Sequence, residues 1–194
     1  MAPKTPTRPR DTAARILDVA EGLVQVRGFN AFSYADVAAE LGITKASLHY
    51  HYPGKGELGV ALLERYTTRF TASLEEIDGR TTDPVEKLRA YAGLYLEVLR
   101  GQRMCLCGML AAEYQTLPEP MQAAVLSFFD ANEAWLGRVL EEGRAGGSLR
   151  FDRPPAETAR LVVGSLQGAL LLARPRADLD GFRDAAELLL ATLA

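Results

Sequence analysis

The stretch from Gly42 to Gly56 is rich in side chains that donate hydrogen bonds, and it contains no acidic residue. On the exposed face of a short helix, such side chains reach phosphate oxygens and base edges. Only Ala46, Leu48 and parts of the tyrosines suit a hydrophobic core. A single Tyr or His is more often packed or solvated than in contact with a ligand. As a group, the donors predict a nucleic-acid contact surface: Thr44, Lys45, Ser47, His49, Tyr50, His51 and Lys55.

A second reactive pattern is the pair Cys105 and Cys107, which follows Arg100 and Arg103. We expect this segment to begin a helix, and both a helix N-terminus and nearby cations lower the pKa of a thiol. A thiolate there would react with electrophiles or oxidants, with Cys105 as the sensing thiol and Cys107 as a second or resolving one. The alternative is that both are core residues, as free cysteines usually are. Two cysteines this close form no disulfide framework, which favours a reducing cytoplasm.

The sequence lacks the common catalytic patterns. It has no Gly-rich phosphate loop, no Gly-x-Ser-x-Gly elbow and no His-Glu-x-x-His site. Its two histidines, His49 and His51, do not face each other on a helix, which argues against a metal site. We therefore expect no enzymatic activity, no metal and no cofactor, with a helical enzyme kept as an alternative.

The elements that carry these residues all repeat at helical spacing, and no segment alternates as a strand does. Ser33 followed by Asp36 resembles a capping box, and Gly28 ends the first helix. The predicted fold class is all-α with about nine helices. These span residues 11–27, 34–41, 44–52, 56–77, 84–100, 105–115, 119–145, 155–174 and 179–193.

Charge and spacing divide the chain into a disordered basic arm (1–10), a helix-turn-helix domain (11–55) and a helical body (56–194). Two short helices joined by a Gly-containing turn make the helix-turn-helix. The whole chain has a net charge of -3, which by itself argues against a nucleic-acid partner. However, residues 1–57 hold seven Lys/Arg and six Asp/Glu, whereas residues 58–194 hold fifteen and nineteen. The acidity thus belongs to the body, and the arm residues Lys4, Arg8 and Arg10 could lie along phosphates.

Residues 12–63 resemble the DNA-binding domain of the TetR family of bacterial repressors. The matching stretches are Ile16–Ala20, Gly28-Phe29, Ser33–Ala38, Leu41–Lys45, Ser47–Tyr52 and Lys55–Leu58. The chain departs from the family pattern at His49, where Tyr is usual, and at Gly54-Lys55-Gly56, where Ser-Lys-Glu is more usual. The resemblance implies that the third helix enters the major groove with Thr44, Lys45, Ser47 and Tyr50. It also implies that Ser33, Tyr34, His51 and Lys55 contact phosphate.

The resemblance further implies that the body binds a ligand and forms a homodimer. Candidate ligand-binding residues are aromatic, sulfur-containing or polar side chains at core spacing: Tyr66, Phe70, Tyr91, Tyr95, Met104, Cys105, Cys107, Glu113, Tyr114, Phe128 and Trp135. Candidate dimer residues lie in the last two helices: Val162, Leu166, Ala169, Leu170, Phe182 and Leu189. For each of these residues, packing within one protomer is the alternative interpretation.

The predicted function is a cytoplasmic transcriptional regulator, by family default a repressor. It would bind a palindromic DNA operator as a dimer, and a small organic or electrophilic inducer would release it. A DNA-binding protein without an effector is an alternative. No window approaches 18 uninterrupted apolar residues, and the N-terminus has no signal-peptide pattern, so we expect no membrane partner.

Overall fold

The computed structural model describes residues 9–193, so most of the expected basic arm lies outside the described residues. The described part contains nine α-helices and no strand, which confirms the all-α prediction. They are α1 (Pro9–Arg27), α2 (Tyr34–Leu41), α3 (Lys45–His51), α4 (Lys55–Arg80), α5 (Pro84–Arg100), α6 (Leu106–Ala112), α7 (Glu119–Ala145), α8 (Pro155–Ala173) and α9 (Leu179–Ala191). Short 3₁₀ turns follow α6 at Tyr114–Thr116 and α8 at Arg174–Arg176.

Helix boundaries follow local capping chemistry. The bounds of α2, α5 and α7 agree with those predicted, and Pro84 opens α5 with the Asp83 carboxylate accepting a hydrogen bond from Val85 N at 2.9 Å. Helix α4 continues to Arg80, three residues beyond its expected end, because the interior Gly79 costs a helix only about 1 kcal/mol. Helix α6 ends at Ala112, earlier than expected, since Glu113 leaves the helix and bonds to another segment.

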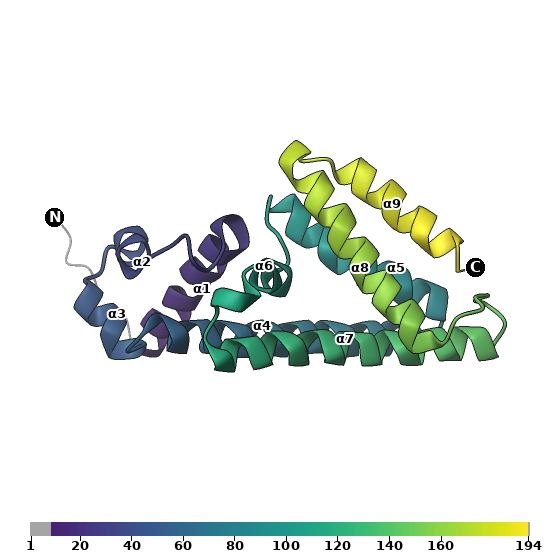
Figure 1. Cartoon of the computed structure of the whole chain (residues 1–194), viewed down its shortest axis with the longest axis horizontal. Coiled ribbons are helices and arrows are strands. Elements are labelled where there is room, and N and C mark those ends of the chain that lie inside the picture. Colours follow the sequence, from purple (N-terminus) through teal and green to yellow (C-terminus); the bar gives the residue numbers. More distant parts are fainter. Residues whose placement is uncertain (1–8, 194) are drawn as a thin grey trace.

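The helices form a head of α1–α3 and a body of α4–α9 (Figure 1). Helix α4 starts at the head and runs along the body beside α7, while α8 and α9 lie together and slant across the far end. Helix α6 lies between the head and the slanted pair, and it packs against both α1 and α7. The long helix α4 and the short helix α6 therefore connect the head to the body.

One continuous core joins the two parts. In the head, Ile16 of α1 and Leu48 of α3 are fully buried, as are Leu58 and Leu63 in the first half of α4. Helix α4 therefore contributes to the packing of both parts. Among the described helices, none is long and apolar enough to cross a lipid bilayer.

Candidate DNA-binding surface and effector cavity

Helix α3 presents its polar side chains outward. Its N-cap, Thr44, accepts a hydrogen bond from Ser47 N at 3.1 Å, which fixes the first turn. Leu48 is fully buried and anchors the inner face, whereas Tyr50 is 81% exposed. Lys45 and His49 are also exposed, and Ser47 is half-buried. The helix therefore presents polar side chains to solvent. Figure 1 places it at one end of the molecule.

The start of α2 lies beside this surface. The Asp36 carboxylate accepts hydrogen bonds from Ser33 N at 2.7 Å and from Ser33 Oγ at 2.6 Å. These bonds lower the pKa of Asp36 and fix the beginning of the helix, as the capping-box pattern predicted. Ser33 itself is exposed, as a phosphate contact requires.

Tyr34 does not fit its predicted role as a phosphate contact. The side chain is buried, and its hydroxyl donates toward the carbonyls of Tyr52 at 2.8 Å and Gly54 at 2.6 Å. Burial raises its pKa to about 12. Tyr34 therefore holds the end of α3 and the following turn onto α2, and this structural use of the hydroxyl corrects the prediction.

Two further candidates, His49 and Lys55, also bond to nearby backbone carbonyls. His49 packs on the Tyr34 ring at 4.8 Å between ring centroids, and its Nδ1 donates to the Pro53 carbonyl at 2.9 Å. Lys55 Nζ donates to the Phe32 carbonyl at 2.6 Å, and partial burial lowers its pKa. His51 is half-buried. Lys55 and His51 are thus only partly accessible, and the exposed residues of α3 form the rest of the surface.

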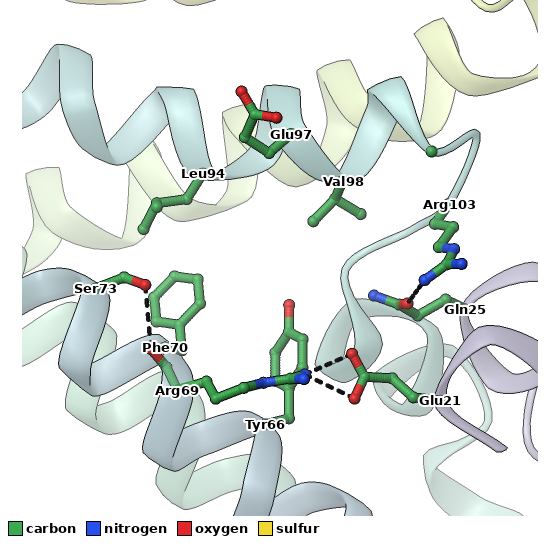
Figure 2. A pocket seen from close by; sticks show the side chains of 11 residues that line it. Glu21, Gln25, Tyr66, Arg69, Phe70, Ser73, Leu94, Glu97, Val98 and Arg103 are labelled. Atoms are coloured by element: carbon green, nitrogen blue, oxygen red, sulfur yellow. Dashed lines mark hydrogen bonds and ion pairs between the residues drawn. The ribbon is translucent and has the colours of Figure 1, made fainter. Parts of the chain in front are cut away.

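A cavity of about 320 Å³ lies between head and body (Figure 2). Helix α1 contributes Glu21 and Gln25, α4 contributes Tyr66, Arg69, Phe70 and Ser73, and α5 with the following loop contributes Leu94, Glu97, Val98, Gly101 and Arg103. Arg69 Nη2 bonds to both oxygens of Glu21, at 2.5 and 2.6 Å. This volume lies within the range of small-molecule sites.

Two family models cover most of the chain. Residues 16–62 match the bacterial regulatory proteins of the tetR family, and residues 84–189 match the tetracycline repressor-like C-terminal domain. The second match alone spans more than half of the sequence. The chain belongs to the TetR family.

Individual TetR-family proteins are similar to most of this chain. The transcriptional repressor DhaR of Mycobacterium sp. strain GP1 is 27% identical over 160 residues, which are 80% of each chain. The repressor NemR of Escherichia coli K12 is 28% identical over 170 residues, 84% of each chain. A TetR-family regulator from Agrobacterium tumefaciens has a TM-score of 0.93 at 33% identity and covers 96% of this chain and all of its own. A structure of reduced E. coli NemR has a TM-score of 0.81 at 26% identity, covering 95% and 98%.

TetR regulators bind DNA and dimerise, yet the residues predicted for dimerisation lie mostly inside this protomer. Val162, Leu166, Leu170 and Phe182 are at most 2% exposed, while Ala169 and Leu189 are half-buried. The exposed apolar side chains of α8 and α9 are instead Leu161, Leu171, Leu172 and Leu188, which are 58–71% exposed. The helices predicted for the interface thus have an unpartnered apolar face, but its residues differ from those expected.

Most of the aromatic residues predicted to line a ligand pocket fill the TetR-like body instead. Tyr91, Tyr95, Phe128 and Trp135 are at most 4% exposed, and Trp135 stacks on Tyr91 at 5.7 Å between ring centroids. Of the predicted set, Tyr66 and Phe70 line the cavity in Figure 2. Met104 lines a separate apolar cavity between α6, α7 and α8. Glu113 and Tyr114 lie at the end of α6 and in the following 3₁₀ turn.

The sequence analysis did not predict the polar residues that line the cavity. Glu21 and Gln25 stand four residues apart on the inner face of α1, where Ala20 and Val24 are fully buried. A polar pair at this spacing within an apolar stripe was the available signal. Arg69 and Arg103 carried no such signal, because only the packing of α4 and the α5–α6 loop against α1 brings them to the cavity.

Both cysteines are buried, at 2% for Cys105 and 0% for Cys107. Burial raises the pKa of Cys107 well above its ordinary value, contrary to the predicted lowering. The two arginines bond elsewhere, Arg100 to Glu97 and Arg103 to Gln25. Cys105 is the N-cap of α6, and the Tyr66 hydroxyl donates to its Sγ at 3.5 Å. Tyr66 thus touches this sulfur and also lines the cavity.

Glu113 connects α6 to the head. Its carboxylate accepts hydrogen bonds from Phe29 N at 2.5 Å and Asn30 N at 3.2 Å. Gly28 leaves space for this carboxylate, since a Cβ added at Gly28 would lie 2.8 Å from Glu113 Oε1. Its φ of +92° also favours glycine over other residues. Thr116 Oγ1 accepts a further bond from Asn30 Nδ2 at 2.7 Å. The loop between α1 and α2 is thereby tied to the end of α6.

Glu113→Gln is expected to lower the free energy of unfolding by about 1–3 kcal/mol, because it leaves one of two backbone N–H groups facing an amide N–H. Urea denaturation measures the effect. Glu119→Gln is the control, since Glu119 is an exposed glutamate at the start of α7. Equal stability of the two variants would contradict the assignment of Glu113 as the link between body and head.

Proposed function

We propose that this TetR-family chain is a repressor that binds a palindromic operator as a homodimer and leaves it when a small molecule binds the body. The outward-facing, acid-free helix α3 carries this proposal, since Thr44, Lys45 and Tyr50 stand on its exposed side. Ser47 lies at the edge of that group, and Ser33 at the start of α2 supplies a phosphate contact. A DNA operator as partner implies a cytoplasmic protein.

The proposed dimer interface is the exposed apolar face of α8 and α9. It comprises Leu161, Leu171, Leu172 and Leu188, with Gly164 and Gly168 between them. A Cβ added at either glycine would meet nothing within 4 Å, so the backbone of α8 is open to close approach by another helix. Pairing α8 and α9 with their copies would cover this face and hold two heads in a fixed relation.

Release follows from geometry and needs no reaction. Two heads read successive major grooves only when they are about 34 Å apart, or a multiple of that distance. The cavity is lined by α1 of the head and by α4 and α5 of the body, so its occupant changes how the head sits on the body. A ligand that prefers the mispositioned heads weakens DNA binding, typically by a coupling free energy of about 1–3 kcal/mol.

Gel-shift titrations with the DNA upstream of the chain's own gene test this proposal. A ligand-released repressor shifts a palindromic fragment at moderate salt, and an effector relieves the shift. A protein without effector control gives a shift that no small molecule relieves, and an enzyme gives no specific shift. Either of these two results would contradict the proposal.

A second candidate mode of release is covalent modification of Cys105. It is favoured by the Tyr66 hydroxyl, which contacts Sγ from a residue that also lines the cavity. The similar NemR structure is described as a reduced form, which fits a family member with a redox-sensitive state.

If this mode operates, Cys105→Ser is expected to abolish release of operator DNA by a thiol-reactive electrophile such as N-ethylmaleimide. Cys107→Ser is the matched control and should keep the response, because burial raises the pKa of Cys107 and keeps its thiol protonated. Anisotropy of labelled operator measures release before and after treatment. Full release from the Cys105→Ser variant would exclude this mode.

A further inference from the structure

The cavity between head and body is lined by a largely buried side chain that leaves one hydrogen-bond donor free. Gln25 is only 4% exposed, and its Oε1 accepts a long hydrogen bond of 3.5 Å from Arg103 Nη1. Its Nε2 has no hydrogen-bond partner within residues 9–193. Figure 2 shows this amide at the edge of the cavity, with Nε2 directed inward. The N–H groups of Nε2 are therefore open to an acceptor that enters the cavity.

One positively charged side chain at the cavity has no acidic partner. Glu21 accepts from Arg65 at 2.9 Å and from Arg69 at 2.5 Å, so it is saturated by arginines. Glu97 is paired with Arg100. Arg103 forms no ion pair within the described part of the chain, although it lines the cavity. An anion that enters therefore finds an unneutralised guanidinium beside the free amide donor.

The rest of the cavity wall suits a short hydrocarbon group. Phe70, Leu94 and Val98 form an apolar side, and the Tyr66 ring lies next to Phe70 at 6.2 Å between centroids. Figure 2 places Leu94 and Val98 on α5, across the cavity from Tyr66 and Arg69 on α4. An apolar wall with a few convergent donors is the usual form of a site for a small organic ligand.

We propose that this cavity binds a small organic monocarboxylate. The carboxylate lies against the Arg103 guanidinium and Gln25 Nε2, and the hydrocarbon part lies on Phe70, Leu94 and Val98. This inference rests on the proposed function in that it names the chemical class of the effector. Gln25 belongs to α1, and its backbone carbonyl accepts a hydrogen bond from Met104 N at 3.1 Å. A bound carboxylate would therefore lie where the head contacts the loop before α6.

The test uses calorimetric titration of the full chain with hexanoate and benzoate, each paired with its neutral amide. At least one carboxylate is expected to bind at least ten-fold more tightly than its amide. Arg103→Gln should remove this preference. Arg103→Lys should keep part of it, since a lysine retains the positive charge but cannot form bidentate hydrogen bonds with a carboxylate. Arg150→Gln is the matched control, because Arg150 is an exposed arginine between α7 and α8, outside the cavity.

Three results would overturn the inference: no binding of either carboxylate, equal binding of acid and amide, or full binding by Arg103→Gln. Operator binding is measured separately on the same proteins. A carboxylate that binds without releasing DNA would leave the site assigned and contradict ligand release. Absence of specific DNA binding by the ligand-free protein would contradict the proposed function alone.

Discussion

The double variant Lys45→Ala/Tyr50→Ala is expected to bind the operator about 100-fold more weakly than the natural chain. Both side chains stand on the outer side of α3, with Tyr50 81% exposed. A good base contact contributes about 1–3 kcal/mol, and each 1.4 kcal/mol corresponds to about ten-fold in affinity. Fluorescence anisotropy of a labelled operator at fixed ionic strength measures the loss.

The same variant should fold as stably as the natural chain, because neither side chain takes part in the core. Arg80→Ala is the control for the loss of one positive charge, since Arg80 is an exposed residue at the body end of α4. Full operator affinity in the double variant would show that α3 does not enter the groove. A parallel loss in Arg80→Ala would show that the effect is general electrostatics.

The second large effect is expected from Leu172→Glu/Leu188→Glu. These leucines are 68% and 71% exposed in one protomer, and they belong to the proposed interface. Glutamate there would bury unpaired charge on association, at a cost of several kcal/mol. The variant should be monomeric at micromolar concentration by light scattering. Its operator affinity should fall more than 100-fold, because the two heads are no longer linked.

Ala72→Glu provides the matched control for added negative charge. Ala72 is exposed on α4, away from α8 and α9, so this variant should stay dimeric and keep its affinity for the operator. A stable dimer of Leu172→Glu/Leu188→Glu would place the interface elsewhere. Circular dichroism of both variants establishes that the helices persist.

The sequence predicted the head better than the body because the head depends on short-range patterns. Ser33 and Asp36 cap α2, Thr44 caps α3, and Leu48 marks the single inward position of a seven-residue helix. Each of these signals acts within one or two turns. The prediction that Tyr34 contacts phosphate was wrong because it depended on long-range contacts. The carbonyls that its hydroxyl bonds to, of Tyr52 and Gly54, are eighteen and twenty residues away in the sequence.

In the body, periodicity alone could not say which apolar face packs inside the protomer. Helix α8 is apolar on several sides, so Leu161 and Val162 looked alike, yet the first is 58% exposed and the second 1%. The cavity depends on a still longer-range arrangement. Gln25 and Arg103 meet only because the loop before α6 folds back onto α1.

The spacing of the operator tests most directly whether a dimer of these heads reads two grooves. The measurement compares anisotropy titrations of the footprinted palindrome with those of the same palindrome carrying about half a helical turn, 5 base pairs, inserted between its half-sites. The account predicts at least a 100-fold loss of affinity on insertion, because the second head then faces away from its groove. Unchanged affinity for the lengthened site would contradict it.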